Sequence, residues 1–127
     1  MEALIHSYDP DREYFFVEGC HINELGNTDS DEALSIAQAR LEPGKTTRWH
    51  WLRDTVERYV LLQGRGSVEV GELPPADVGP GDVVVIPPGV RQRITALGDR
   101  DLVFLALCTP RFEVANYVDV QDEMDEQ

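Results

Sequence analysis

Two glycine-bounded segments in the middle of the chain constrain its fold more than any other feature of the sequence. The first runs from Gly44 to Gly64 and carries His50 and Glu57 between its glycines. The second follows a connection rich in turn residues and reads Gly-Asp-Val-Val-Val-Ile-Pro-Pro-Gly-Val-Arg-Gln over residues 81–92. Glycine supplies the positive φ of tight turns and proline pre-sets a bend. The segments therefore predict short strands that end in defined turns.

The rest of the chain shows the same pattern, with short apolar or β-branched runs separated by turn residues. No stretch keeps a helical apolar period for long, which favours an all-β fold. Strands are predicted over residues 14–18, 34–41, 46–52, 58–63, 67–70, 82–86, 91–96 and 102–108. Eight or so strands suit a jelly roll. Residues 120–127 should form a frayed tail or one short surface helix.

The spacing within the two segments resembles the paired signature of the cupin superfamily. Its first motif is a glycine, five residues, His-x-His, four residues, glutamate, six residues and a glycine. Its second is a glycine, five residues, Pro-x-Gly, two residues and a histidine. The matching positions here are Gly44, His50, Glu57, Gly64, Gly81, Pro87 and Gly89. Leu52 stands in place of the second histidine and Gln92 in place of the third.

This resemblance covers residues from 34 to about 117. Within the superfamily, the chain is similar in pattern to small single-domain bacterial cupins. It implies a double-stranded β-helix, or jelly-roll barrel. A length of 127 residues fits a single domain, so we expect one cupin domain over 1–127 with an acidic tail at about 119–127.

Strand alternation indicates which side chains point into such a barrel. Side chains two positions apart share a face of a strand, so His50 and Leu52 should point inward together, as should Glu57 and Tyr59. Gln92 should also be inward. We therefore expect His50, Glu57, Tyr59 and Gln92 to converge in one cavity. Cys108 should lie on the last barrel strand, on the same face as Leu102, Phe104 and Ala106.

The resemblance implies a metal site, because a typical cupin places three histidines and a glutamate around one divalent metal, commonly iron, manganese, nickel or zinc. The set that remains here is His50, Glu57 and Gln92. An amide oxygen is a weaker donor to such metals than an imidazole or a carboxylate. We therefore expect weak metal binding at most, unless His21, Glu24 or Cys108 adds a ligand.

Two classes of function follow from this set. In the first, the protein is an enzyme for a small molecule, with isomerase-, lyase- or dioxygenase-type chemistry. His50 and Glu57 would be its catalytic residues, Tyr59 would donate to an oxyanion, and Gln92 and Cys108 would contact the substrate. Without metal, the same residues could perform acid/base catalysis, as in a dehydratase or an epimerase. In the second class, the protein is a ligand-binding cupin without catalysis.

The composition of the chain limits the kinds of molecule it can bind and the compartment it suits. A net charge of −13 argues against nucleic acid and anionic membranes, although an anionic small substrate stays open. Two cysteines, Cys20 and Cys108, are too few for a disulfide framework. No secretory leader or membrane-spanning run is recognisable, so we expect a cytoplasmic protein. Uncovered strand edges favour a homodimer, and the resemblance to small single-domain cupins implies the same.

Residues beside the motif positions are assigned simpler roles. His6 is expected to be a bystander, and His21 is one too unless it joins the metal. Trp49 and Trp51 flank His50 on the opposite face of the strand. They should cover the sheet or form a dimer contact. The arginines near the motifs should be solvated or lie between subunits, namely Arg48, Arg58 and Arg93.

Overall fold

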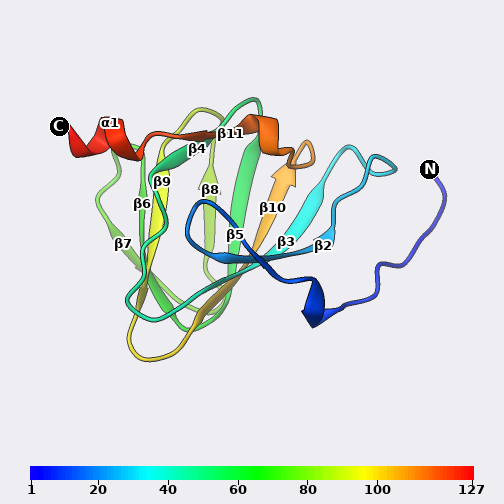
Figure 1. Cartoon of the computed structure of the whole chain (residues 1–127), viewed down its shortest axis with the longest axis horizontal. Coiled ribbons are helices and arrows are strands. Elements are labelled where there is room, and N and C mark those ends of the chain that lie inside the picture. The colour runs from blue at the N-terminus through cyan, green and yellow to red at the C-terminus, as the bar shows by residue number, and fades with distance from the viewer.

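The structure is a computed structural model that describes residues 1–127. Two antiparallel sheets face each other in a jelly-roll barrel (Figure 1). One sheet has six strands in the order β1 (Tyr14–Phe15), β2 (His21–Gly26), β3 (Ser35–Leu41), β10 (Leu102–Thr109), β5 (Val56–Gln63) and β8 (Val83–Ile86). The other has five, in the order β11 (Tyr117–Asp119), β4 (His50–Leu52), β9 (Gln92–Leu97), β6 (Arg65–Val70) and β7 (Ala76–Val78). The all-β prediction is confirmed.

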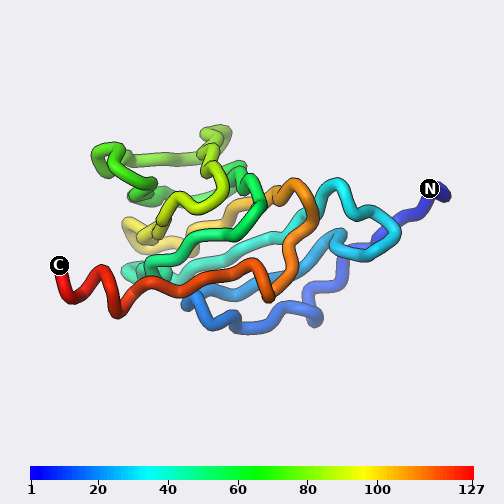
Figure 2. The backbone as a smooth tube through the Cα atoms, turned by 90° about the horizontal axis from the view of Figure 1, so that it is seen from above, coloured from blue at the N-terminus to red at the C-terminus, as the bar shows by residue number.

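Helical structure is limited to three short pieces: the 3₁₀ turns η1 (Pro10–Arg12) and η2 (Val114–Asn116), and the helix α1 (Gln121–Asp125). The short surface helix expected near the C-terminus is therefore present. No helix has the length and apolar character that crossing a membrane requires. Figure 2 shows the two chain ends on opposite sides of the molecule, with the first residues extending away from the barrel.

Inward and outward residues alternate along the central strands as expected for a two-layer fold. On β5, the buried positions are Glu57, Tyr59 and Leu61, and on β9 they include Gln92 and Ile94. The polar residues of the cupin motif thus follow the same periodicity as the hydrophobic core. Their position inside the barrel is a consequence of strand register.

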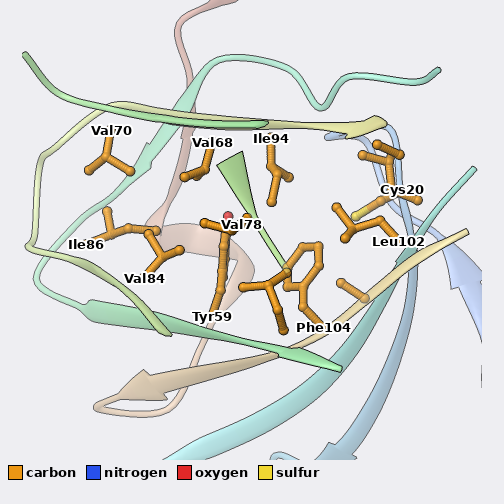
Figure 3. Close-up of a cluster of buried hydrophobic side chains, with 14 of the residues drawn as sticks. Cys20, Tyr59, Val68, Val70, Val78, Val84, Ile86, Ile94, Leu102 and Phe104 are labelled. Carbon is orange, nitrogen blue, oxygen red and sulfur yellow. The ribbon is translucent and has the colours of Figure 1, made fainter. Parts of the chain in front are cut away.

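The hydrophobic core fills one part of the space between the sheets. Figure 3 shows Val84 and Ile86 facing Val68 and Ile94 from the other sheet. Tyr59 and Phe104 also belong to this cluster, with ring centroids 4.4 Å apart. Both rings also line the cavity described below, so they form the boundary between core and cavity.

The last glycine of the first motif has a clear steric reason. Gly64 has a φ of +78°, and a Cβ at this position would lie 2.6 Å from the carbonyl oxygen of Asp101. Any other residue would combine an unfavourable backbone conformation with a backbone clash. This glycine allows β5 to turn directly into β6 beside the start of β10.

The structure differs from the strand predictions mainly at the start of the chain. The strand expected over 14–18 contains only β1, and β2 was not predicted. Burial along β2 does not alternate, because Ile22 and Asn23 are both buried. β7 and β11 are three residues each and were also not predicted. The strand expected over 46–52 is regular only in β4, preceded by a single bridge between Thr46 and Thr95.

Because β2 pairs with β3, the six-stranded sheet extends to residues before position 34, where the sequence resemblance starts. This N-terminal part of the sheet is important for the site, because the turn between β1 and β2 carries one of its carboxylates.

Candidate functional site

A cavity lies between the two sheets next to the hydrophobic core. The space inside it that water could occupy is about 50 Å³, and it opens to solvent at its mouth. Its walls are mostly apolar, and they include the aromatic residues Tyr14, Phe16, Tyr59, Phe104, Phe112 and Tyr117. The titratable groups of its wall, apart from these tyrosines, are Glu18, Glu24, His50, Glu57 and Cys108. Pockets of this type, apolar with a few convergent polar groups, are typical of small-molecule sites.

His50 on β4 is fixed by two contacts and is 2% exposed. Its Nδ1 lies 2.7 Å from the backbone carbonyl oxygen of Arg48, which can only accept, so Nδ1 carries a hydrogen and donates it. Its Nε2 lies 3.3 Å from Oε2 of Glu18. Because an unprotonated Nε2 and a carboxylate oxygen would repel each other, one further proton belongs between them. The His50–Glu18 pair therefore holds a proton inside the cavity.

Glu57 on β5 is the second carboxylate and is 9% exposed. Its Oε1 accepts a hydrogen bond of 2.8 Å from Nε2 of Gln92, and its Oε2 has the thiol of Cys108 at 3.8 Å. Burial raises the pKa of Glu57 to about 7, the positive charge of His50 opposes this rise, and the charge of Glu18 adds to it. Glu57 can therefore gain or lose a proton near neutral pH.

Gln92 on β9 lies between Tyr59 and Glu57 and is fully buried. The hydroxyl of Tyr59 donates to its Oε1, while its Nε2 donates to Glu57. Burial raises the pKa of Tyr59 well above its usual value, so this hydroxyl stays protonated. Both ends of the Gln92 amide are thus used within the protein, and Gln92 is not part of the cavity wall.

The structure brings the four expected inward residues together, but not as a set of three free metal donors. The only oxygen of the Gln92 side chain accepts from Tyr59, and the buried Leu52 at the neighbouring motif position offers no donor. No group of three or more histidine, cysteine, aspartate or glutamate side chains is arranged to hold a metal ion. The donor set does not fit the metal that the cupin resemblance implies.

Of the further ligands that the sequence suggested, two reach the cavity. Glu24 and Cys108 line it. Burial raises the pKa of Cys108, and Glu57 raises it further, so its thiol stays protonated. His21 does not reach the cavity, since its Nε2 lies 2.7 Å from the exposed carboxylate of Glu42.

Sequence reasoning missed two residues of the site. Glu18 lies in the turn between β1 and β2, outside both motifs, and reaches His50 only because the chain folds that way. Tyr117 on β11 stacks on the imidazole of His50, with ring centroids 5.0 Å apart and an interplanar angle of 27°. Its hydroxyl is buried and has no hydrogen-bond partner. No signal in a single sequence distinguishes either residue from its neighbours.

The residues around His50 are held mainly by contacts with the C-terminal segment. Trp49, just before β4, is buried, and its backbone N–H donates to the side chain of Gln121. The guanidinium of Arg93 covers its ring at 4.5 Å from the centroid. Arg48 is exposed and pairs with Asp119. Within one chain, Trp49 thus packs against Arg93 and the C-terminal segment.

The Cupin domain family model matches residues 37–108, which is more than half of the chain. The chain belongs to the cupin family. This confirms the resemblance seen in the two glycine-bounded motifs.

Among curated relatives, glucose-6-phosphate isomerase of Pyrococcus horikoshii is 33% identical over 86 residues, covering 58% of this chain and 46% of the relative. The chain therefore spans about half the length of this relative. Among solved structures, KdgF from Halomonas sp. has a TM-score of 0.74 at 20% identity, covering 86% of this chain and 96% of KdgF. Pac13, a nucleoside dehydratase from Streptomyces, has a TM-score of 0.75 at 15% identity, covering 93% and 92%. These structural likenesses establish the double-stranded β-helix fold.

Proposed function

We propose that this protein is a small-molecule enzyme that transfers protons in the cavity through Glu57 and the His50–Glu18 pair. One observation carries the proposal: two proton-holding groups in different states line the same cavity. In the pair, Nε2 of His50 and Oε2 of Glu18 lie 3.3 Å apart, while burial raises the pKa of Glu57 to about 7. A catalytic acid or base is most effective when its pKa lies near the working pH. The arrangement suits one group that removes a proton and another that supplies one.

The contacts of Glu57 favour Oε2 as the reacting oxygen. Oε1 is held by Gln92, whereas Oε2 has only a thiol at 3.8 Å as its neighbour. In our proposal, Oε2 takes a proton from a carbon of the substrate. The His50–Glu18 pair gives its proton to an oxygen of the substrate.

Two outcomes balance these transfers. If the protonated oxygen is a hydroxyl, its C–O bond breaks, a C=C bond forms and water leaves. If it is a carbonyl beside a hydroxyl-bearing carbon, an enediol forms. Glu57 then returns its proton to the former carbonyl carbon while the other hydroxyl gives its proton back to the His50–Glu18 pair, which completes an isomerisation. A lyase-type dehydration and an isomerisation thus need the same residues. The known activities of the isomerase and dehydratase relatives support this class of chemistry.

We assign Tyr59 and Gln92 to positioning. The hydroxyl of Tyr59 donates to Gln92 and so does not serve as a direct oxyanion donor in this proposal. The two residues hold Glu57 in one orientation. Cys108 contributes a neutral, slightly polar surface beside Oε2 of Glu57.

A weakly held iron, manganese, nickel or zinc ion is the competing interpretation. His50 could bind it only through Nε2, because Nδ1 donates to the carbonyl of Arg48. The ion would therefore displace the proton shared with Glu18. We expect calorimetric titration of the wild type to show no saturable binding at micromolar metal, and Gln92→His to bind more strongly than the wild type. Activity that disappears on chelation and returns with a metal would overturn the metal-free proposal.

The direct test is hydrogen exchange from substrate carbon. A panel of small hydroxy and carbonyl compounds is incubated with the protein in D₂O, and NMR records deuterium incorporation or loss of water. We expect one compound class to react with the wild type, and the rate to fall at least about 100-fold in His50→Gln and Glu57→Gln. Glu72→Gln, which changes an exposed carboxylate, is the matched control. Saturable binding without exchange in any compound would favour a ligand-binding cupin instead.

We also propose that the protein is a cytoplasmic homodimer consisting of one cupin domain. The edge strand β8 supports the dimer, because Val83 and Val85 are each 58% exposed on it. Sedimentation velocity should give a dimer at micromolar concentration. A clean monomer would contradict the proposal.

A further inference from the structure

The cavity carries more carboxylates than its one basic side chain, His50, can neutralise. Its lining includes the carboxylates of Glu18, Glu24 and Glu57, and contains no lysine or arginine. The proton shared with His50 makes the His50–Glu18 pair neutral as a unit. Glu24 accepts only from the neutral amide of Asn27, at 3.1 Å, so its charge is not offset. Glu57 adds a second negative charge as the pH rises through its pKa of about 7.

Two arginines close in sequence to residues of the cavity wall are already engaged elsewhere. Arg111 donates to the side-chain oxygen of Asn27 at 2.8 Å, while its Nη1 pairs with Glu113 at 3.0 Å. Arg48 lies on the outer side and pairs with Asp119. Neither is part of the cavity wall, and the one cationic group of the wall, His50, is already paired with Glu18, so an anion inside would find no free cationic partner. The net charge of −13 on the whole chain adds repulsion at longer range.

Much of the cavity wall is aromatic and apolar, in contrast to the carboxylates. Phe16 makes edge-to-face contacts with Tyr14, Phe112 and Tyr117, at centroid distances of 6.4, 6.1 and 5.2 Å. Such a wall favours a flat or apolar face of a ligand. Because it also excludes water, it strengthens electrostatic interactions inside the cavity. Repulsion of an anion is therefore larger here than at an open surface.

Building on the proposed function, we infer that the substrate is an uncharged or cationic small molecule with a flat or apolar face and with hydroxyl or N–H donors for the carboxylates. Phosphorylated and carboxylated compounds are excluded from the cavity. The anionic substrate that composition alone left open is therefore rejected. The sequence similarity to glucose-6-phosphate isomerase does not bring a phosphorylated substrate with it.

The test uses probes that share one phenyl ring and carry substituents of different charge: benzyl alcohol, benzylamine, benzoate and phenyl phosphate. Ligand-observed NMR at pH 8 measures their binding to the full chain. We expect the neutral and cationic probes to bind at least about 10-fold more tightly than the two anions. Anions that bind as tightly as the alcohol, or a failure of the alcohol and the amine to bind, would overturn the inference.

Two variants assign the selectivity to this cavity. Glu24→Gln keeps the oxygen that accepts from Asn27 but removes the charge, so the preference over benzoate should fall about 3- to 10-fold. Glu72→Gln changes an exposed carboxylate outside the cavity and should leave the preference unchanged. Equal effects of the two variants would reject the assignment to the cavity. The assay measures binding alone, so its failure leaves proton transfer standing, and normal selectivity without deuterium exchange would reject proton transfer alone.

Discussion

The side-chain amide of Gln92 donates to Oε1 of Glu57 across 2.8 Å, at the position where the cupin signature has its third histidine. A residue that would otherwise contribute a metal ligand instead holds the carboxylate in place. Together with the hydroxyl of Tyr59, it forms a short buried hydrogen-bonded chain. Buried chains of this kind are costly to interrupt, because each group left without a partner retains its desolvation penalty.

Replacing Gln92 with leucine should therefore destabilise the protein strongly. Tyr59 loses its acceptor and Glu57 loses its donor, which should lower the free energy of unfolding by roughly 2–5 kcal/mol. Urea unfolding monitored by circular dichroism measures the change. Gln63→Leu is the control, since this half-buried glutamine on the opposite sheet makes one longer bond of 3.3 Å to the backbone of Asp101. Equal losses in both variants would contradict the structural role of Gln92.

The raised pKa of Glu57 predicts a specific dependence of stability on pH. Its folded pKa is about 7 against an ordinary value of 4.5, so between these values the folded protein binds more protons at this residue than the unfolded chain. The unfolding free energy must therefore fall as the pH rises from 4.5 to 7. The burial cost of the charge is complete above pH 7.

Glu57→Gln should remove this contribution. We expect the variant to gain stability relative to the wild type as the pH rises from 5 to 8, by an amount on the order of 2–3 kcal/mol. The difference between the two proteins cancels most other titrating groups, and Glu72→Gln should show no such trend. A constant difference between pH 5 and pH 8 would place the pKa of Glu57 near its ordinary value.

The inward positions of the site were predictable because they follow from register. Once the motif places His50 and Glu57 on strands, alternation also assigns Tyr59 and Gln92 to the interior, and the structure confirms this. Pairing across strands was not predictable in the same way. Whether the oxygen of Gln92 faces Tyr59 or the cavity depends on side-chain packing, which a single sequence does not specify.

Glu18 and Tyr117 were not predictable for a different reason. Glu18 lies in a turn next to β2, whose burial does not alternate, and no local pattern marks that segment as part of the barrel. Tyr117 reaches His50 because the three-residue strand β11 pairs with β4. Both contacts join segments distant in sequence, and both depend on tertiary structure rather than on local propensity.

The two cysteines should react slowly with thiol reagents. Both are buried, and burial raises the pKa of each thiol, with Glu18 adding to the effect at Cys20 and Glu57 at Cys108. The reactive thiolate is therefore scarce at neutral pH. Labelling with a disulfide-exchange reagent should be at least about 100-fold slower in buffer than in urea. Rapid reaction of Cys108 in the folded protein would show that the cavity opens widely enough to expose this thiol.

Replacing Tyr117 should affect the stability of the protein and its ligand binding in opposite directions. Its hydroxyl is buried without a partner, and burial raises its pKa, so it is a protonated donor that nothing in the protein satisfies. Removing it in Tyr117→Phe should leave the free energy of unfolding unchanged or raise it by up to about 1 kcal/mol, since no hydrogen bond is lost. The ring would still stack on His50.

Ligand binding should respond in the opposite direction. If the hydroxyl of Tyr117 meets a polar group of the ligand, Tyr117→Phe should weaken binding of benzyl alcohol about 3- to 10-fold, because one hydrogen bond contributes about 1 kcal/mol. Tyr8→Phe, at a 60% exposed tyrosine, is the control for loss of a hydroxyl. Thermal denaturation and ligand-observed NMR on the same samples separate the two effects. A variant that is less stable than the wild type but binds equally well would show that this hydroxyl supports the fold and does not contact the ligand.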